Sequence, residues 1–351
     1  MQKVTLQHIA EKAGICKATV SYVLNGVYKN KRISEKTAKK ILRIAKNMDY
    51  RFDEVARGMS NGRTNSIGFI SACDIRQEYI SGVLMGAMDK ADELHLSIKL
   101  LHYRGRKKEE ILSECRSQRL SGLMCYDFER ELTGFLHKNL AEDGIPLVVV
   151  SNTEAPAGTF HVMADDRQGA GLAVEHLHRL GHARIAFMSS DYSRLYEKDR
   201  LTGYLDKLKE LGLKTSPDYI VSTNEKSVRI EFINRICSMK NGPTAMICTS
   251  DATAISMISY LQGAGRKVPG NMSIVGYGDL SAGRVMIPAL TTIVEPYSQI
   301  GAKAVEMIHE YLSKQTPSTC KELLSVKLLA RESTCRIGHQ DMAHIQRHPT
   351  G

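Results

Sequence analysis

Cysteine and histidine side chains can bind metal ions, and cysteines can also form disulfides, so their spacing is the first indication of chemistry in this sequence. No two cysteines form a C-x-x-C pair, and several lie in apolar, strand-like segments, which favours buried free thiols in a reducing compartment. His176 and His178 would point about 200° apart on a helix, so we expect no metal site there, even with His182 nearby. The eight cysteines are Cys16, Cys73, Cys115, Cys125, Cys237, Cys248, Cys320 and Cys335.

Sequence motifs of enzymes give no indication of catalysis. The chain contains neither the G-x-x-x-x-G-K-[ST] phosphate-binding motif nor the H-E-x-x-H zinc motif. We therefore predict no catalytic residue, no metal and no cofactor. A perturbed pair of carboxylates in a cleft would reopen the possibility of an enzyme.

Length and composition are those of a globular protein with more than one domain. The chain has 351 residues, of which 42% are hydrophobic and 25% charged. It has no run of eighteen apolar residues, and its first residues lack the apolar segment and cleavage site of a signal peptide. We therefore expect no contact with a membrane and a location in the cytoplasm.

Positive charge is concentrated at the N-terminal end. The net charge is +10, and residues 1–63 hold 14 Lys and Arg against 5 Asp and Glu, whereas residues 64–351 hold 34 against 33. Such a concentration indicates a small domain that binds a polyanion. Composition alone leaves open a solvated basic face without a partner, so the pattern within this segment must decide.

Three short helices are predicted in the basic segment, at residues 5–13, at residues 17–24 and from about Ser34. Apolar residues recur in each at helical spacing, with Thr5 as a possible N-cap and Gly14 in the first turn. Two short helices around a Gly-containing turn, braced by a third, form a helix-turn-helix unit. Its second helix is the one that enters the major groove of DNA.

Six runs of residues in and just after this segment carry a recognisable pattern: Val4–Ala10, Ala13–Ile15, Lys17–Gly26, Ile33–Thr37, Tyr50–Arg51 and Val55–Arg57. In these runs the chain resembles the headpiece of LacI/GalR-type transcriptional regulators. The resemblance implies a helix-turn-helix DNA-binding headpiece at residues 1–51, followed by a hinge helix and linker at residues 52–65.

The resemblance also implies a role for individual residues of the headpiece. Lys17, Ala18 and Tyr22 take the positions that face base edges, where Lys17 could reach guanine and Ala18 a thymine methyl group. Cys16 replaces the usual Ser or Thr cap of this helix, and a thiol is a weaker acceptor. Short polar side chains suited to phosphate oxygens are Thr5, Thr19, Ser21 and Asn25.

In the hinge, the resemblance implies contacts to the minor groove. Arg57 would contact the backbone or the groove, and Met59 would take the place of an apolar wedge between base steps. Gly58 within this helix costs about 1 kcal/mol relative to Ala. We therefore predict a hinge that is disordered without DNA and depends on its partner hinge, with a plain linker as the alternative.

From residue 66 onward, short β-rich runs alternate with amphipathic segments of helical length. This alternation predicts an α/β fold with parallel sheets, divided into two lobes that face each other across a cleft. The resemblance continues here and implies a core like that of periplasmic binding proteins at residues 66–335, followed by a polar tail at 336–351. Lobe 1 would comprise residues 66–164 and 296–323, and lobe 2 residues 165–295 and 324–335. Predicted strands are Ile67–Ile70, Ser97–Leu101, Gly122–Tyr126, Leu147–Val150, Arg184–Ser189, Ala245–Thr249 and Ser273–Tyr277.

The resemblance implies that an effector binds in the cleft. Arg200 and Asp251 match positions that hold hydroxyl or carboxylate groups, whereas several neighbouring positions depart from the usual pattern. From these departures we expect fewer charged groups here than in typical sugar sensors. Candidate effector-binding residues are Tyr79, Ser151, Asn152, Arg200, Ser250, Asp251 and Asp279.

The resemblance implies a DNA-binding regulator, most simply a repressor that binds a palindromic double-stranded operator as a homodimer and responds to a sugar or related metabolite. It would be nucleoid-associated when bound to DNA. A protein partner in place of the metabolite, or no effector at all, stays open because of the departures in the cleft. A solute-binding transport protein is a remote alternative that the basic headpiece argues against. No heptad of leucines follows Arg336, which favours a dimer over a tetramer.

Overall fold

The computed structural model of the chain separates two compact units, Met1–Thr64 and Asn65–Gly351. The hinge residues Arg57 and Met59, and with them the predicted order of the hinge, lie outside the part that the structure describes. The described residues are 4–24, 28–48, 50, 64–103, 105–126, 130–151, 153–190, 194–313 and 319–337.

The N-terminal unit contains the three predicted helices, α1 (Leu6–Ala13), α2 (Lys17–Leu24) and α3 (Glu35–Asn47), with a short 3-10 turn at Tyr28–Lys31. The Thr5 side chain accepts a hydrogen bond from the His8 amide and caps α1, as predicted. Gly14 ends α1 in the left-handed region at φ 66°, which glycine adopts without steric cost. Ser34 caps α3 through the Thr37 amide. These helices pack around a small core formed by Ile9, Ala10, Ala13, Val20, Val23, Ala38, Ile41 and Ala45.

The first lobe of the larger unit is a six-stranded sheet in which every pair of strands is parallel. Continuous apolar runs such as Leu147–Val150 form its central strands, because helices cover both faces of a parallel sheet. Its strand order is β11 (Lys321–Leu324), β5 (Phe160–Ala164), β4 (Leu147–Val150), β3 (Gly122–Tyr126), β1 (Ser66–Ser71) and β2 (Ser97–Leu101). Its helices are α5 (Glu78–Glu93), α6 (Lys108–Ser117), α7 (Arg130–Glu142) and α13 (Tyr297–Leu312).

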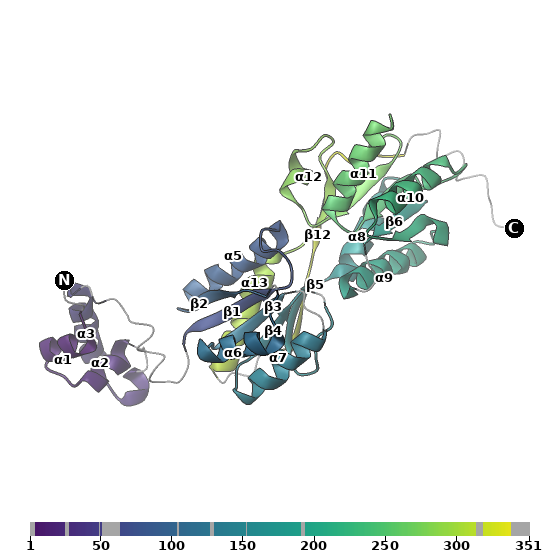
Figure 1. Ribbon diagram of the computed structural model, residues 1–351. Helices are drawn as coiled ribbons and strands as arrows, with labels where there is room; N and C mark the ends of the chain where they lie inside the picture. Colours follow the sequence, from purple (N-terminus) through teal and green to yellow (C-terminus); the bar gives the residue numbers. More distant parts are fainter. Residues whose placement is uncertain are drawn as a thin grey trace. The chain divides into compact units, whose positions relative to one another are not determined.

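The second lobe repeats this architecture with one antiparallel edge strand, β12 (Lys327–Leu329), which pairs with β10 (Thr291–Val294). Figure 1 shows the two sheets as separate layers, each flanked by helices. The strand order of the lobe 2 sheet is β12 (Lys327–Leu329), β10 (Thr291–Val294), β9 (Ser273–Tyr277), β8 (Ala245–Cys248), β6 (Ile185–Ser189) and β7 (Ile220–Ser222). Its helices are α8 (Asp166–Arg179), α9 (Leu195–Glu210), α10 (Lys226–Ser238), α11 (Asp251–Gly263) and α12 (Ser281–Val285).

The α/β fold with two parallel-sheet lobes confirms the predicted fold class. The sequence nevertheless missed strands β5, β7, β10, β11 and β12. Most of these have three or four residues, and β7, β11 and β12 lie at sheet edges, where partial exposure weakens the apolar signal of a strand. The expectation that every predicted strand precedes a helix is also wrong, because β4 is followed by a loop and β5.

The chain passes between the two lobes three times: from β5 to α8, from β10 to α13, and from β11 to β12. These crossings bring residues far apart in the sequence to one place. Within lobe 1, helices α5 and α13 approach so closely that a Cβ on Gly86 would lie 1.9 Å from the Ser298 carbonyl oxygen. No helix in the described part of the chain is both long and apolar enough to cross a bilayer.

The structure shows the burial of the cysteines and the hydrogen bonds of His182, which were considered above as possible metal ligands. All eight cysteines are free thiols, but only Cys115, Cys125 and Cys248 are buried, so the prediction of burial is wrong for the exposed Cys16 and Cys320. His182 binds Thr244 Oγ1 through Nδ1 at 2.9 Å and the Cys335 carbonyl through Nε2 at 3.0 Å. Both of its ring nitrogens therefore hold parts of lobe 2 together.

Candidate functional site

A cavity of about 200 Å³ lies where the carboxyl ends of strands from both lobes meet. This is the place where ligands bind in open α/β sheets, because side chains on the loops beyond the strands converge there. The residues that line it are Tyr79, Val83, Tyr126, Ser151, Ala164, Asp166, Ser190, Tyr196, Glu197, Arg200, Thr249, Ser250, Asp251, Ala252, Tyr277, Gly278, Leu280, Glu295, Tyr297 and Ile300.

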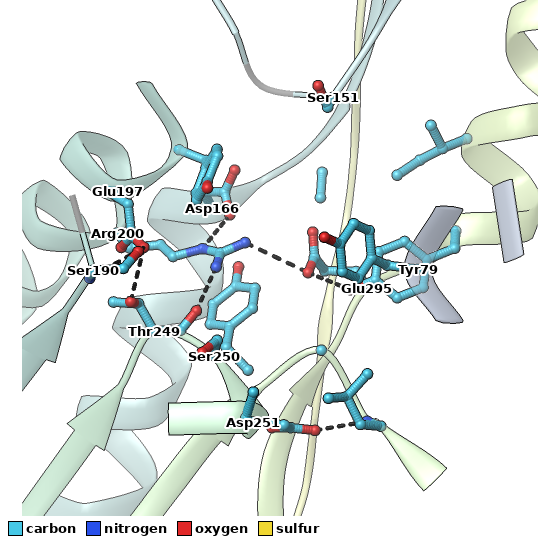
Figure 2. A pocket seen from close by; sticks show the side chains of 18 of the residues that line it. Tyr79, Ser151, Asp166, Ser190, Glu197, Arg200, Thr249, Ser250, Asp251 and Glu295 are labelled. Atoms are coloured by element: carbon cyan, nitrogen blue, oxygen red, sulfur yellow. Dashed lines mark hydrogen bonds and ion pairs between the residues drawn. The ribbon is translucent and has the colours of Figure 1, made fainter. Parts of the chain in front are cut away.

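Arg200, on α9, occupies the middle of this cavity and is only 7% exposed. Its Nε donates to Asp166 Oδ1 and one terminal nitrogen to the Thr249 carbonyl oxygen, both at 2.6 Å (Figure 2). The other terminal nitrogen lies 3.4 Å from Glu295 Oε2. The guanidinium also lies 3.6 Å above the centre of the Tyr277 ring. Arg200 is therefore held by groups from α8, from the ends of β8 and β9, and from the crossing between β10 and α13.

Glu197, one turn before Arg200 on α9, is 1% exposed. Its Oε1 accepts hydrogen bonds from the Ser190 hydroxyl and from Thr249 Oγ1. Its Oε2 is buried and has no hydrogen-bond partner among the described residues. Burying a carboxylate oxygen without a hydrogen-bond donor costs free energy. A ligand that donates a hydrogen bond to this atom would remove that cost.

Asp251 begins α11 and is also almost fully buried. Its two oxygens accept from the Thr292 hydroxyl at 2.6 Å and from the Leu280 amide at 2.7 Å. Burial raises the pKa of its carboxyl, against the effect of these hydrogen bonds. Ser250 caps the same helix through the Thr253 amide. Asp251 therefore holds the loop after β9, and both side chains line the cavity.

Glu295 and Tyr297 come from the crossing between β10 and α13. The Tyr297 hydroxyl donates to Glu295 Oε2 at 2.6 Å. Burial raises the pKa of Glu295 to about 7, while the nearby Arg200 opposes this rise. Tyr79 stacks with Tyr126 at a ring separation of 6.2 Å and lies 6.3 Å from the Tyr297 ring. The lobe 1 side of the cavity is therefore aromatic.

The structure brings together five of the seven cleft residues proposed from the sequence: Tyr79, Ser151, Arg200, Ser250 and Asp251. Asp279 does not line the cavity, since its carboxylate pairs with Arg331 at 2.6 Å and Arg284 at 2.8 Å. Asn152 lies outside the described residues.

The cleft holds charged groups that the sequence did not indicate. Four carboxylates and one guanidinium line the cavity, because Asp166, Glu197 and Glu295 join Asp251 and Arg200. Sequence reasoning missed these three acids. Among them, Glu197 lies one helical turn from Arg200, which was a usable signal. For Glu295, nothing local in the sequence indicated the cavity.

The N-terminal unit presents one face of α2 to solvent. Val20 and Val23 are buried, whereas Lys17, Ala18 and Tyr22 are exposed. Thr19 and Ser21 are half-buried, and Thr5 is exposed at the start of α1. Cys16 Sγ lies 3.1 Å from Thr19 Oγ1 just before α2 begins, and this hydrogen bond lowers the pKa of the thiol. Asn25 is not among the described residues.

Each of the two units contains a segment that matches a known protein family. Residues 5–53 match the family described as bacterial regulatory proteins, lacI family. Residues 174–334 match the periplasmic binding protein-like domain.

Individual relatives match over nearly the whole chain. The HTH-type transcriptional repressor PurR of Photobacterium profundum is 26% identical over 335 residues, which cover 94% of this chain and 98% of the relative. PurR of Pasteurella multocida is also 26% identical, over 94% of this chain and 98% of its own length.

Solved structures share the fold. A LacI family transcriptional regulator from Mycobacterium smegmatis superposes with a TM-score of 0.66 and 26% identity, covering 78% of this chain and all of that one. The lac repressor dimer bound to operator and the anti-inducer ONPF superposes with a TM-score of 0.73 at 23% identity, over 95% of this chain and all of that one. The chain therefore joins a helix-turn-helix domain of the lacI family of bacterial regulatory proteins to a periplasmic binding protein-like domain.

Proposed function

We propose that this protein is a transcriptional repressor that binds a pseudo-palindromic operator as a homodimer. The observation that carries the proposal is the solvent-facing side of α2, where Lys17, Ala18 and Tyr22 are exposed while Val20 and Val23 fix the helix to the core. An exposed second helix of a helix-turn-helix unit is the element that enters the major groove. The net charge of residues 1–63 supplies attraction to phosphate.

In this proposal, Lys17, Ala18 and Tyr22 contact base edges. Arg57 and Met59, whose structure is not described, would contact the minor groove. No catalytic role is assigned to any residue, and the protein would act in the cytoplasm, where its operator lies. The remaining residues, Thr5, Thr19, Ser21 and Asn25, would contact the phosphate backbone.

Exposed apolar side chains on α5, on β2 and around α12 support a homodimer. Met85 and Met88 on α5 are 54% and 45% exposed, and Leu100 on β2 is 52% exposed. Val285 and Ile287, at α12 and just beyond it, are exposed by more than four-fifths. Large apolar side chains at this exposure are typical of a surface that a second copy covers. A dimer would also place two headpieces on the two half-sites of one operator.

The cavity between the lobes is proposed as the site of a small-molecule effector. Its wall is formed by both lobes and by a chain crossing, so a bound molecule contacts groups that move when the lobes change their angle. A ligand that binds one arrangement of the lobes more tightly shifts the population toward it, and thereby changes the dimer and its affinity for DNA. The proposed contacts are Tyr79, Ser151, Arg200, Ser250 and Asp251. Asp279 would act indirectly, through the ion pairs that it makes from the loop after β9.

The proposal is tested by selecting binding sites for the full-length protein from random double-stranded DNA. We expect two inverted half-sites, and a binding constant that falls with salt at a log–log slope of about −0.9 for each neutralised phosphate. Lys17→Ala should relax the preference at one base position in each half-site, at a cost of about 1–3 kcal/mol. Thr19→Ala should weaken binding to all sequences alike.

Lys240→Ala, which removes an exposed lysine of the core unit, is the matched control for loss of charge and should bind as the wild type does. Selection of no sequence, or equal losses for Lys17→Ala and Lys240→Ala, would contradict the proposal. Specific binding that no small molecule alters would leave the repressor in place and favour control by a protein partner.

A further inference from the structure

The wall of the interlobe cavity carries an excess of negative charge. Asp166, Glu197, Asp251 and Glu295 line it, and Arg200 is the one Lys or Arg among the described residues that line it. All five side chains are buried or nearly so, because Glu295, the most exposed of them, has a side-chain exposure of 14%. In a desolvated site such an imbalance costs free energy unless a further positive charge or several hydrogen-bond donors enter it.

Arg200 is poorly placed to bind an anionic ligand. Its guanidinium already donates to Asp166 and to the Thr249 carbonyl, pairs with Glu295, and packs against Tyr277. Recognition of a phosphate or carboxylate uses the planar fork of an Arg in a bidentate manner. Here that fork is directed at protein groups, and any anion that entered would meet the four carboxylates as well.

Glu197 supplies a second and independent observation. Its Oε1 is held by Ser190 and Thr249, which fixes the orientation of the carboxylate. Its Oε2 is buried in the wall of the cavity without a donor among the described residues. An ionised carboxylate is an acceptor only, so this oxygen can be satisfied by a donor such as an ammonium group and not by another acceptor.

Aromatic faces surround the same space. Tyr79, Tyr126 and Tyr297 lie on the lobe 1 side, and Tyr196 and Tyr277 on the lobe 2 side. In Figure 2, Tyr79 and Glu295 lie across the pocket from Glu197 and Ser190. A tyrosine face attracts a cation through its quadrupole, and it also packs against the apolar body of a ligand. Carboxylates together with aromatic faces are the two features that recognise a protonated amine.

We propose that this cavity binds a small molecule that carries a protonated amine, with the ammonium group hydrogen-bonded to Glu197 and the body of the molecule against the tyrosines. This inference rests on the proposed function, in which the cavity holds the effector. A cavity of about 200 Å³ is smaller than the roughly 300–1,000 Å³ of pockets for drug-sized ligands, so a molecule such as an amino sugar or a short diamine suits it.

Binding of a cation should also release a proton. Burial among acids raises the pKa of Glu295 to about 7, so part of this group is protonated at neutral pH. A positive charge nearby favours the ionised form and lowers that pKa. Amine binding near pH 7 is therefore expected to expel a fraction of a proton per site.

The experiment compares ligands that differ only in the amine. Melting temperatures and calorimetric dissociation constants of the full-length protein are measured with glucosamine and glucose, galactosamine and galactose, and cadaverine and 1,5-pentanediol. We expect at least one amine to bind at least tenfold more tightly than its neutral counterpart. Repeating the titration in two buffers of different ionisation enthalpy should reveal proton release for that amine.

Glu197→Gln keeps an oxygen for Ser190 and Thr249 but replaces the charged acceptor by a donor, so it should abolish the preference for the amine. Glu210→Gln, on the exposed end of the same helix, is the matched control and should leave the preference unchanged. The wild-type comparison decides by itself if Glu197→Gln does not fold.

Amines that bind no better than their neutral counterparts in every pair, including pairs in which neither member binds, overturn the inference. Tighter binding of a neutral sugar would do so while leaving the cavity as an effector site. Failure of the proposed function is seen separately, as a failure of the full-length protein to select any DNA sequence.

Discussion

The carboxylate of Glu78 accepts hydrogen bonds from the backbone amide and the hydroxyl of Ser281, at 2.8 and 2.7 Å, across 203 positions of sequence. Glu78 is the first residue of α5 in lobe 1, and Ser281 is the first residue of α12 in lobe 2. Their neighbours Tyr79 and Leu280 line the cavity. This pair is therefore a direct link between the lobes beside the proposed effector site.

We predict that the Glu78–Ser281 link contributes about 1 kcal/mol to the stability of the core, since it is charge-assisted but exposed to solvent. Glu78→Gln and Ser281→Ala should each weaken it, and the double variant should lose less than the sum of the two. The coupling is measured by a double-mutant cycle in urea unfolding. Strictly additive losses would show that the two groups do not interact in solution.

The close contact between α5 and α13 predicts two sensitive glycines. A Cβ on Gly86 would lie 1.9 Å from the Ser298 carbonyl oxygen, and one on Gly301 would lie 1.9 Å from that of Val83. Gly86→Ala and Gly301→Ala should each lower the free energy of unfolding by about 1–3 kcal/mol, because backbone must move to admit the methyl group. Chemical denaturation of the core measures the change.

Gly263 provides the matched control for these glycines. It lies on α11, is exposed, and has no atom within 4 Å of the position of a Cβ. Gly263→Ala should be neutral or stabilise by up to about 1 kcal/mol, through loss of backbone entropy in the unfolded chain. If all three variants lost similar stability, the packing explanation would fail.

Stability should depend on pH through Glu295. The pKa of Glu295 is raised from 4.5 to about 7 by burial, so the folded state binds this proton more tightly than the unfolded state does. Its contribution is present at low pH and is lost as pH rises from about 4.5 to about 7. Glu295→Gln should remove this loss, so the variant becomes more stable relative to the wild type as pH rises.

Buried His161 acts in the opposite sense. Burial lowers its pKa from 6.5 to about 4, so its contribution to stability is lost as pH falls through that range. The difference between wild type and Glu295→Gln isolates Glu295, because His161 is common to both proteins. Melting curves between pH 5 and 8 supply the measurement, and a pH-independent difference would refute the assigned shift.

Alkylation of Cys16 should block DNA binding. The thiol is exposed immediately before α2, and its hydrogen bond with Thr19 lowers its pKa and thereby increases its thiolate fraction. Iodoacetamide adds a bulky group next to Lys17 and should lower DNA affinity at least tenfold. Cys16→Ser should resist the reagent, whereas Cys320→Ser, which removes the other exposed thiol, should remain sensitive. Inhibition of Cys16→Ser would place the sensitive group elsewhere.

The headpiece could be predicted from the sequence almost residue by residue. Thr5 and Ser34 cap their helices through amides three positions away, and Gly14 ends α1 through its own backbone conformation. Such interactions depend on residues within one helical turn, so they are visible in any window of the sequence. The parallel strands could also be predicted from short segments of the sequence, since burial on both faces gives each of them a run of apolar residues.

Only the tertiary structure decided the composition of the cavity. Arg200 and Asp251 were proposed from the sequence, but the partners that fix Arg200 come from α8, the end of β8 and a lobe crossing. Asp279 was expected in the cleft, yet Arg331, 52 positions away, holds its carboxylate elsewhere. A helix cap is set by its own turn, whereas the charge of a cavity is set by which distant strand ends meet. The sequence by itself therefore indicated some of the residues that line the cavity. Which of them face one another was decided by the tertiary structure, in which three chain crossings join the two lobes.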